Sequence, residues 1–208
     1  MKYLGSRLSA AMWARVVILW LTLSLGALVL GVVAIKLGGF VQDNIRTELA
    51  SQQISFNPLD KMADEEKQIP GMVENAGQPL TTGNQAKVYS ELMALHVHNI
   101  TASSGYPDAT YATLGGTFFQ LQAALKAVDP KDQAAVDTAT AKFKAVSDLR
   151  NTLQTASTLR GNLLAAYGWD NVATGIIATG AFMVLLAVVF FVLFGYEWRR
   201  GHLPPVEA

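Results

Sequence analysis

The sequence predicts an all-α membrane protein in which two transmembrane helices flank a helical-bundle extracytoplasmic domain. Charged residues make up 15% of the 208 residues, well below the roughly 25% of an ordinary soluble domain. Two long segments carry no charge, and arginine and tryptophan residues lie at their ends. The chain between them shows helical periodicity and no convincing period-two alternation, which would indicate strands.

The two uncharged segments are long enough to cross a membrane. Val16 to Ile35 covers 20 residues, and Asn171 to Tyr196 covers 26. Twenty helical residues span roughly 30 Å, the thickness of the hydrocarbon core, and a backbone in lipid must satisfy its hydrogen bonds within its own segment. We therefore expect transmembrane helices at 16–35 and 171–196. A cleaved signal peptide is the alternative for the first segment, but its apolar region is usually only about 7–15 residues long.

The formal net charge of zero hides an asymmetry along the chain. Residues 1–15 hold three basic residues and no acid, residues 36–170 hold 11 basic and 14 acidic residues, and residues 197–208 are neutral. Membrane proteins keep lysine and arginine near their spans on the cytoplasmic side. We therefore expect cytoplasmic tails at 1–15 and 197–208, and an extracytoplasmic helical domain at 36–170.

The residues next to the spans are the main evidence for this orientation, with both tails in the cytoplasm. Arg15, Arg199 and Arg200 lie on the tail side, and Lys36 alone opposes them. Aromatic residues typical of the membrane interface lie near the span ends at Trp13, Trp169, Tyr196 and Trp198. Two buried helices of a soluble protein, the alternative interpretation, do not explain this flanking pattern.

The extracytoplasmic segment begins with a continuation of the first helix. Apolar residues recur there at helical spacing, at Val41, Ile45 and Leu49. A bend is expected at Gly38-Gly39. Residues 56–80 hold three prolines, which predicts a loop with one short helical turn. The acidic cluster Asp64-Glu65-Glu66 lies in this loop, and we expect it to be a solvated face rather than a cation site.

A capping box predicts the next helix. Thr82 at the cap and Gln85 three residues later match this motif. One face of the helix that follows carries Val88, Tyr89, Leu92, Met93, His96 and Ile100. Residues 101–109 are expected to be loop. Thr110 to Val128 is expected to be helical, with a break or a close contact at Gly115-Gly116.

The last helix is expected to be the longest. Asp129-Pro130 combines an N-cap aspartate with proline at the first helical position, which predicts a helix start. An apolar stripe then continues towards the second span. Gly161 and Gly168 are the positions where this helix is expected to break, if it breaks at all.

Two small-residue pairs in the spans favour close helix contact. They are Ala27-x-x-x-Gly31 and Gly175-x-x-x-Thr179. The contact can form between the two spans or with a partner's helix, and the sequence does not choose between these. Four phenylalanines in the second span are expected to touch lipid or another helix rather than a quinone or carotenoid; they are Phe182, Phe190, Phe191 and Phe194.

Two histidines raise the possibility of a metal site. His96 and His98 are two residues apart and point in nearly opposite directions on a helix, whereas helical metal pairs prefer a spacing of four. Glu91 shares a face with His98 but lies two turns away, about 10 Å. We therefore expect one packed and one exposed histidine and no metal ligand. A site completed by a distant loop stays open as the alternative.

No catalytic motif is recognisable. A nucleophile elbow, a phosphate loop, a dinucleotide fingerprint and a zinc-protease helix are all missing from the sequence. The chain has no cysteine, which excludes disulfides, thiolate nucleophiles and iron–sulfur clusters. Zero net charge argues against a protein that coats nucleic acid. We therefore predict no catalytic, cofactor-binding or metal-binding residues, no cofactor and no nucleic-acid partner.

Three segments carry a family resemblance. They are GQPLTTGNQAKVYSELMALHVHNI (Gly77 to Ile100), GYPDATYATL (Gly105 to Leu114) and TLRGNLLAAYG (Thr158 to Gly168). Over most of residues 50–195 the chain resembles a group of uncharacterised two-span membrane proteins found mainly in high-GC Gram-positive bacteria. The resemblance implies a bacterial cytoplasmic membrane location and one outer domain between two spans. It implies no activity and assigns no functional residues.

These expectations favour a non-catalytic accessory or structural subunit of a membrane protein complex. Its expected partners are membrane lipid and other integral membrane proteins or further copies of the chain. An extracytoplasmic ligand-sensing subunit is the first alternative, and it would have to signal through a partner. A metal-binding protein or enzyme built on His96, His98, Glu91 and the acidic loop is the second.

Overall fold

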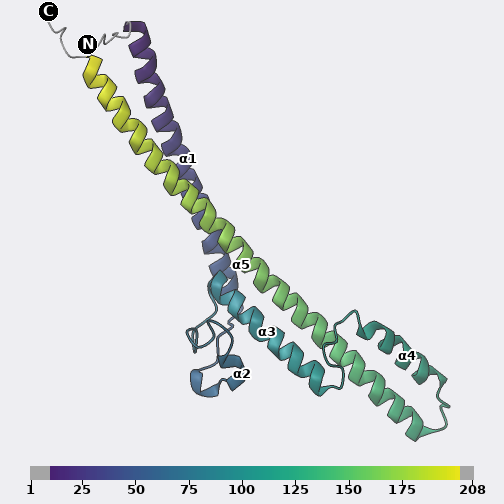
Figure 1. The fold of residues 1–208 in the computed structure, drawn as a ribbon. Helices are drawn as coiled ribbons and strands as arrows, with labels where there is room; N and C mark the ends of the chain where they lie inside the picture. The colour runs from purple at the N-terminus through teal and green to yellow at the C-terminus, as the bar shows by residue number, and fades with distance from the viewer. Residues whose placement is uncertain (1–9, 202–208) are drawn as a thin grey trace, which may run out of the picture. The chain divides into compact units, whose positions relative to one another are not determined.

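The computed structural model describes residues 10–201, which fold mostly as helices (Figure 1). The elements are α1 (Ala10–Ser51), the 3-10 turn η1 (Leu59–Lys61), α2 (Asp64–Lys67), α3 (Gly83–Ser103), α4 (Leu114–Ala127) and α5 (Gln133–Gly201). An isolated antiparallel bridge joins Ser55 to Pro79. The all-α part of the predicted fold class is therefore confirmed. Two helices, α1 and α5, are long and apolar enough to cross a membrane.

The chain divides into two compact units. The first comprises the chain up to Asn44 and from Asp170 onward, and the second comprises Ile45–Trp169. In the first unit α1 and α5 lie side by side (Figure 1). Their contact is the main tertiary interaction there, because no other helix belongs to this part of the described chain.

The seam between α1 and α5 is made of small residues. A Cβ atom added to Gly31 would lie 2.7 Å from the carbonyl oxygen of Gly180, and one added to Gly180 would lie 2.7 Å from the carbonyl oxygen of Gly31. At Gly38 an added Cβ would lie 2.8 Å from the carbonyl oxygen of Ala173. No side chain larger than hydrogen fits at these positions without moving a backbone. The glycines therefore set how closely the two helices approach.

The buried positions of the seam repeat every seven residues. The positions with this spacing are Val17, Ser24, Gly31 and Gly38 on α1, and Ala173, Gly180 and Ala187 on α5. Ala27 on α1 is buried as well and lies three residues after Ser24. A seven-residue period keeps one stripe of each helix turned towards its partner, as in left-handed coiled coils. The repeat explains why Gly31 belongs to the seam while Gly175 does not. Gly175 lies about 200° around α5 from Ala173, and an added Cβ there meets nothing within 4 Å.

Polar side chains form hydrogen bonds between α1 and α5 along the seam. The Ser24 hydroxyl is buried and donates to the carbonyl oxygen of Ala187 at 2.8 Å. The Gln42 amide donates to the Thr174 hydroxyl at 3.0 Å. At the opposite end of the seam the Trp13 indole N–H donates to the carbonyl oxygen of Glu197 at 2.9 Å. A buried polar group without a partner costs roughly 2–7 kcal/mol in an apolar environment, and the bond of the buried Ser24 hydroxyl avoids that cost.

Both long helices run through the glycines at which a bend or break was expected. Helix α1 is continuous through Gly38-Gly39, and α5 is continuous through Gly161 and Gly168. A glycine in a helix interior costs roughly 1 kcal/mol relative to alanine. Gly38 offsets this cost through its contact with α5, and the long hydrogen-bonded ladders on both sides hold the other positions.

Two helix starts differ from those expected. Helix α5 begins at Gln133 rather than at Pro130, because the Asp132 carboxylate accepts a hydrogen bond from the Ala135 amide at 3.1 Å and so caps it. The Asp129 carboxylate instead accepts from the Lys131 amide at 2.9 Å in a local turn. Helix α4 begins at Leu114, four residues later than expected, after a turn that starts at Thr110. It does not break at Gly115-Gly116.

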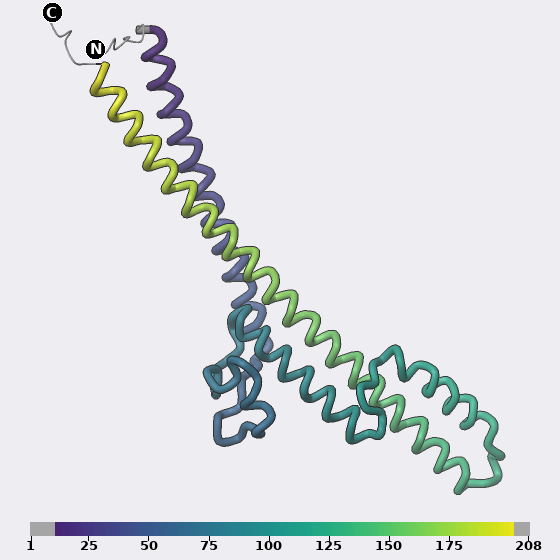
Figure 2. Tube along the Cα trace, viewed as in Figure 1, coloured from purple at the N-terminus to yellow at the C-terminus, as the bar shows by residue number. Residues whose placement is uncertain are grey.

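The core of the second unit gathers residues from distant parts of the chain. Its buried members are Leu49, Phe56, Met62, Met72, Leu80, Ala86, Leu92 and Leu163. The segment between α1 and α3 folds back on itself beside the start of α3 and supplies four of them (Figure 2). A smaller cluster of Leu114, Leu149 and Leu153 fixes the start of α4 against α5.

The predicted capping box of α3 is confirmed. The Thr82 hydroxyl accepts from the Gln85 amide at 3.2 Å, and the Gln85 side chain accepts from the Thr82 amide at 3.1 Å. The same side-chain oxygen accepts from the Thr81 amide at 2.8 Å. Gln85 also donates to Asn75, which ties the helix start to the preceding loop.

The glycine seam yields the first prediction. We expect Gly180→Val to destabilise the helix pair by about 1–3 kcal/mol, because overpacking forces backbones apart. Cross-linking of cysteines introduced at Ser24 and Ala187 measures the contact, since the chain has no cysteine of its own. The matched control is Gly175→Val, which changes the same residue type on the same helix where nothing lies within 4 Å. Equal cross-linking rates in the two variants would contradict the role of the seam.

Candidate functional site

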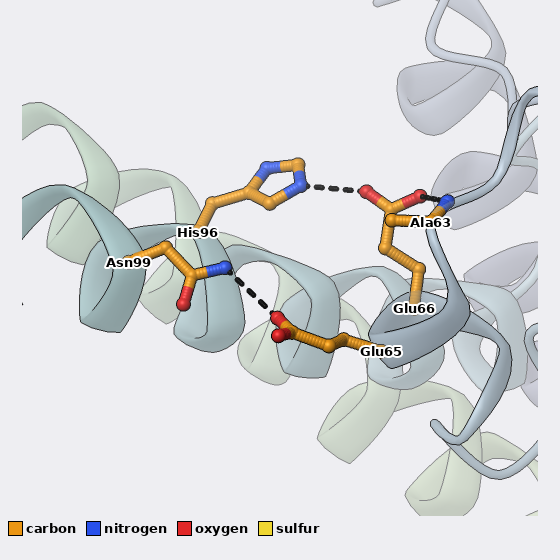
Figure 3. Close-up of polar contacts among 5 residues, drawn as sticks. All are labelled: Ala63, Glu65, Glu66, His96 and Asn99. Atoms are coloured by element: carbon orange, nitrogen blue, oxygen red, sulfur yellow. Dashed lines mark hydrogen bonds and ion pairs between the residues drawn. The ribbon is translucent and has the colours of Figure 1, made fainter.

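Glu66 is the one carboxylate that is buried among residues 10–201. Helix α2 positions it by a capping interaction, in which the Ala63 amide donates to Oε2 of Glu66 at 3.1 Å. Its other oxygen, Oε1, lies 2.8 Å from Nε2 of His96 on α3 (Figure 3). The Glu66 side chain is 10% exposed and that of His96 is 42% exposed. Both carboxylate oxygens therefore have a nitrogen partner.

A second contact runs parallel to this one. The Asn99 amide donates to the Glu65 carboxylate at 3.3 Å (Figure 3). His96 and Asn99 are three residues apart and so share one face of α3. Two adjacent acids of α2 are thus bound to two residues one turn apart on α3. The pair of contacts fixes the loop that carries α2 on the surface of α3.

The expectation of a solvated acidic cluster is correct for Asp64 and wrong for Glu66. The Asp64 side chain is 94% exposed and pairs with Lys67 at 2.9 Å. The Lys67 ammonium lowers the pKa of the Asp64 carboxyl, first through their hydrogen bond and then through its charge. Glu66 turns the other way because it caps α2 and meets His96. The sequence shows the acids but not which of them faces α3.

Tyr89 lies in the same region of α3. Its ring packs edge-on against Phe56, with ring centroids 5.5 Å apart. Burial raises the pKa of the Tyr89 phenol, and the charge of Glu66 raises it further. A phenolate here would lose hydration and face a carboxylate, so the neutral phenol is favoured.

The expectation of one packed and one exposed histidine is met only in part, because His96 is half-buried while His98 is exposed. Nδ1 of His98 lies 3.1 Å from the Asp108 carboxylate, and the side chains are 58% and 80% exposed. Glu91 is exposed, and neither histidine contact involves it. Within residues 10–201, no group of three His, Cys, Asp or Glu side chains is placed to hold a metal ion. The arrangement holds segments together by hydrogen bonds and offers no set of ligands.

A groove of about 730 Å³ lies on α3 beside this cluster. It is lined by Glu65, Gln68, Ile69, Pro70, Asn84, Lys87, Val88, Glu91, Ala94, Leu95 and Tyr167. The Lys87 ammonium lies 5.2 Å from the centre of the Tyr167 ring, which is a cation–π distance. Glu91, a possible ion-pair partner, is one helical turn away on α3. The size falls in the range of small-molecule sites, roughly 300–1,000 Å³.

Helix α4 presents an apolar surface that sequence reasoning did not single out. Leu114 is its only buried residue, and Phe119 is 63% exposed. The Arg150 guanidinium of α5 stacks on Tyr111 at 3.9 Å and lies 5.0 Å from the Phe118 ring centre. The signal was present in the sequence, because α4 carries a single charge, Lys126, and apolar residues on more than one face. A soluble surface helix normally has a continuous polar face.

Comparison with known proteins gives no family for this chain. No protein-family model matches it, and neither a curated protein nor a solved structure matches it. The resemblance to bacterial two-span proteins therefore stays an expectation from the three sequence segments.

The Glu66–His96 contact yields the second prediction. In a double-mutant cycle with Glu66→Gln and His96→Gln, we expect a coupling of about 1–2 kcal/mol, as for a hydrogen bond to a charged group. Urea unfolding of the full chain in detergent micelles measures it. The matched control cycle uses His98→Gln and Asp108→Asn, whose exposed side chains should couple by less than about 0.5 kcal/mol. Two equal couplings would show that Glu66 does not anchor the loop.

The raised pKa of Tyr89 yields the third prediction. The folded state holds the phenolic proton more tightly than the unfolded chain does, whose tyrosine pKa is about 10. This stability is present below that pH and is lost as the pH rises through the folded pKa. We expect Tyr89→Phe to flatten the alkaline loss of stability, measured as melting temperature against pH. An unchanged alkaline profile would argue against a raised pKa of the half-buried Tyr89 phenol.

Proposed function

We propose that this chain is a non-catalytic accessory or structural subunit of a bacterial cytoplasmic-membrane protein complex. Helices α1 and α5 supply its two spans at 16–35 and 171–196, and both tails lie in the cytoplasm. Residues 36–170 form the extracytoplasmic domain. Its partners are membrane lipid and other integral membrane proteins or further copies of the chain.

The outward faces of the α1–α5 pair support a membrane location. Only 22% of the most apolar stretch of α1 and 11% of that of α5 is buried. Large apolar side chains remain exposed on both helices, with Ile18 and Val192 each at 63%. In water such a continuous apolar surface is rare, because it drives association. A lipid bilayer solvates it, while the small-residue seam holds the pair together.

The apolar surface of α4 carries the proposal of a subunit role. Phe119 is 63% exposed and Tyr111 is 39% exposed, and both lie in the unit outside the proposed spans. A shallow groove of about 510 Å³ runs between α4 and the start of α5 and is lined largely by alanine, leucine and valine. Exposed aromatic residues and apolar grooves are both typical of protein–protein contacts. Lipid does not reach this unit in the proposed topology, so a protein partner is the expected cover.

The groove on α3 favours one alternative, an extracytoplasmic ligand-sensing subunit. It combines an apolar floor with one ammonium, Lys87, and two carboxylates, Glu65 and Glu91. A small ligand bound there would raise the melting temperature of the folded chain in proportion to its occupancy. A screen of small metabolites therefore separates this alternative from the subunit role.

Affinity purification from gently solubilised native membranes tests the proposal and is the fourth prediction. We expect the full chain to retain at least one integral membrane partner, and Phe119→Ala to lose it without lowering the melting temperature. The matched control, Gln120→Ala, changes an exposed polar neighbour on the same helix and should keep the partner. Migration of the parent chain alone on native gels would count against the subunit role.

Thiol labelling of intact cells that produce the chain tests the proposed topology. The chain has no cysteine, so single cysteines at Ser51 and Ala208 report their own location. An impermeant thiol reagent added to intact cells should label Ser51→Cys and leave Ala208→Cys unlabelled until the membrane is opened. The reverse pattern would overturn the proposed orientation.

A further inference from the structure

The first turns of α1 and the last turns of α5 meet at one end of the helix pair. The Trp13 indole donates to the carbonyl oxygen of Glu197, and its ring lies 6.0 Å from the Trp198 ring. A Cβ added to Gly201 would collide with the Trp13 ring. Trp13 therefore spans residues 197–201 of α5. Side chains of α1 near Trp13 and side chains of α5 at 197–201 therefore lie at the same height along the helix pair.

Three arginines lie at this height. Arg199 and Arg200 are within the stretch of α5 that Trp13 contacts, and Arg15 is two residues along α1, about 3 Å further along the axis. All three side chains are exposed. None of them forms an ion pair with a carboxylate in the described part of the chain. Among the described residues at this end of the pair, Glu197 is the one acid, so the three arginines leave an excess of positive charge.

Aromatic side chains adjoin the arginines on the side of the apolar segments. The Trp198 ring lies 5.9 Å from Phe194, and Trp20 lies 5.7 Å from Phe190. Tryptophan is favoured at the boundary between headgroups and acyl chains, and arginine just beyond that boundary reaches the phosphate layer. On α5 the order is thus apolar residues, aromatic rings and guanidinium groups, which matches the order of chemical layers in a bilayer. On α1 Trp20 lies on the apolar side of Arg15, and Trp13 lies two residues beyond it.

We propose that Arg15, Arg199 and Arg200, here called the arginine band, bind the headgroup phosphates of anionic phospholipids. Guanidinium groups form two parallel hydrogen bonds to a phosphate. A group of basic residues next to a span attracts anionic lipid, each contributing about 1 kcal/mol near the surface. The inference rests on the proposed membrane location and adds a lipid class to it.

The test is a comparison of lipid selectivity in reconstituted vesicles, and it is the fifth prediction. The full chain carrying Trp169→Phe is placed in phosphatidylcholine vesicles doped with brominated phosphatidylglycerol or brominated phosphatidylcholine. The remaining tryptophans are Trp13, Trp20 and Trp198, so quenching reports the end that carries the band. We expect phosphatidylglycerol to be preferred on the order of fivefold, and the preference to fall with salt. Added inorganic phosphate should not compete if the lipid itself is bound.

Two variants with equal charge change decide the outcome. The triple variant Arg15→Gln, Arg199→Gln, Arg200→Gln should bring the preference close to unity. The matched control Lys36→Gln, Arg46→Gln, Arg160→Gln removes three exposed cations elsewhere and should keep it. Two results would overturn the lipid site and leave the proposed function intact. In the first, the chain without the arginine substitutions inserts into the vesicles but shows no preference for phosphatidylglycerol. In the second, both triple variants lose that preference equally. Failure of the thiol-labelling test would overturn the membrane location itself.

Discussion

The close approach of Gly31 and Gly180 is the constraint on which the first unit depends. Each glycine faces the backbone of the other helix, so the two main chains touch where ordinary side chains would keep them apart. Dispersion contacts between the two backbones therefore contribute to the stability of the pair. In the proposed membrane location they would act in place of the hydrophobic effect, which does not hold helices together in lipid. The Ser24 hydroxyl can bond across the seam to Ala187 only because of this spacing.

The second unit is held by a different kind of interaction. Its core is apolar, but the loop between α1 and α3 has little regular structure of its own beyond η1 and α2. The Glu66 and Glu65 contacts to α3 fix that loop at two points one turn apart. A buried carboxylate is expensive unless its oxygens are bonded, and both oxygens of Glu66 are. These contacts therefore hold the loop against α3.

The two units leave exposed apolar surfaces of different character. The surface of the α1–α5 pair is long, uniform and free of charge except at its ends, which suits a fluid solvent such as lipid. The surface of α4 is small and contains the exposed ring of Phe119, which suits a specific protein partner. The proposed function follows from this difference. The surface of the α1–α5 pair would be solvated by lipid, and the surface of α4 would bind a protein partner.

The sequence by itself determined the helical class, the two apolar segments and the cap at Thr82, because each depends on residues close together in the chain. Charge spacing and capping are local, and so is the period of an apolar stripe. The tertiary structure alone decided that Gly180 rather than Gly175 meets α1, that Glu66 rather than Asp64 turns inward, and that the long helices continue through their glycines. Those outcomes depend on which face of a helix meets a partner distant in the sequence. A rotation of one or two residues changes that face, and only packing selects it.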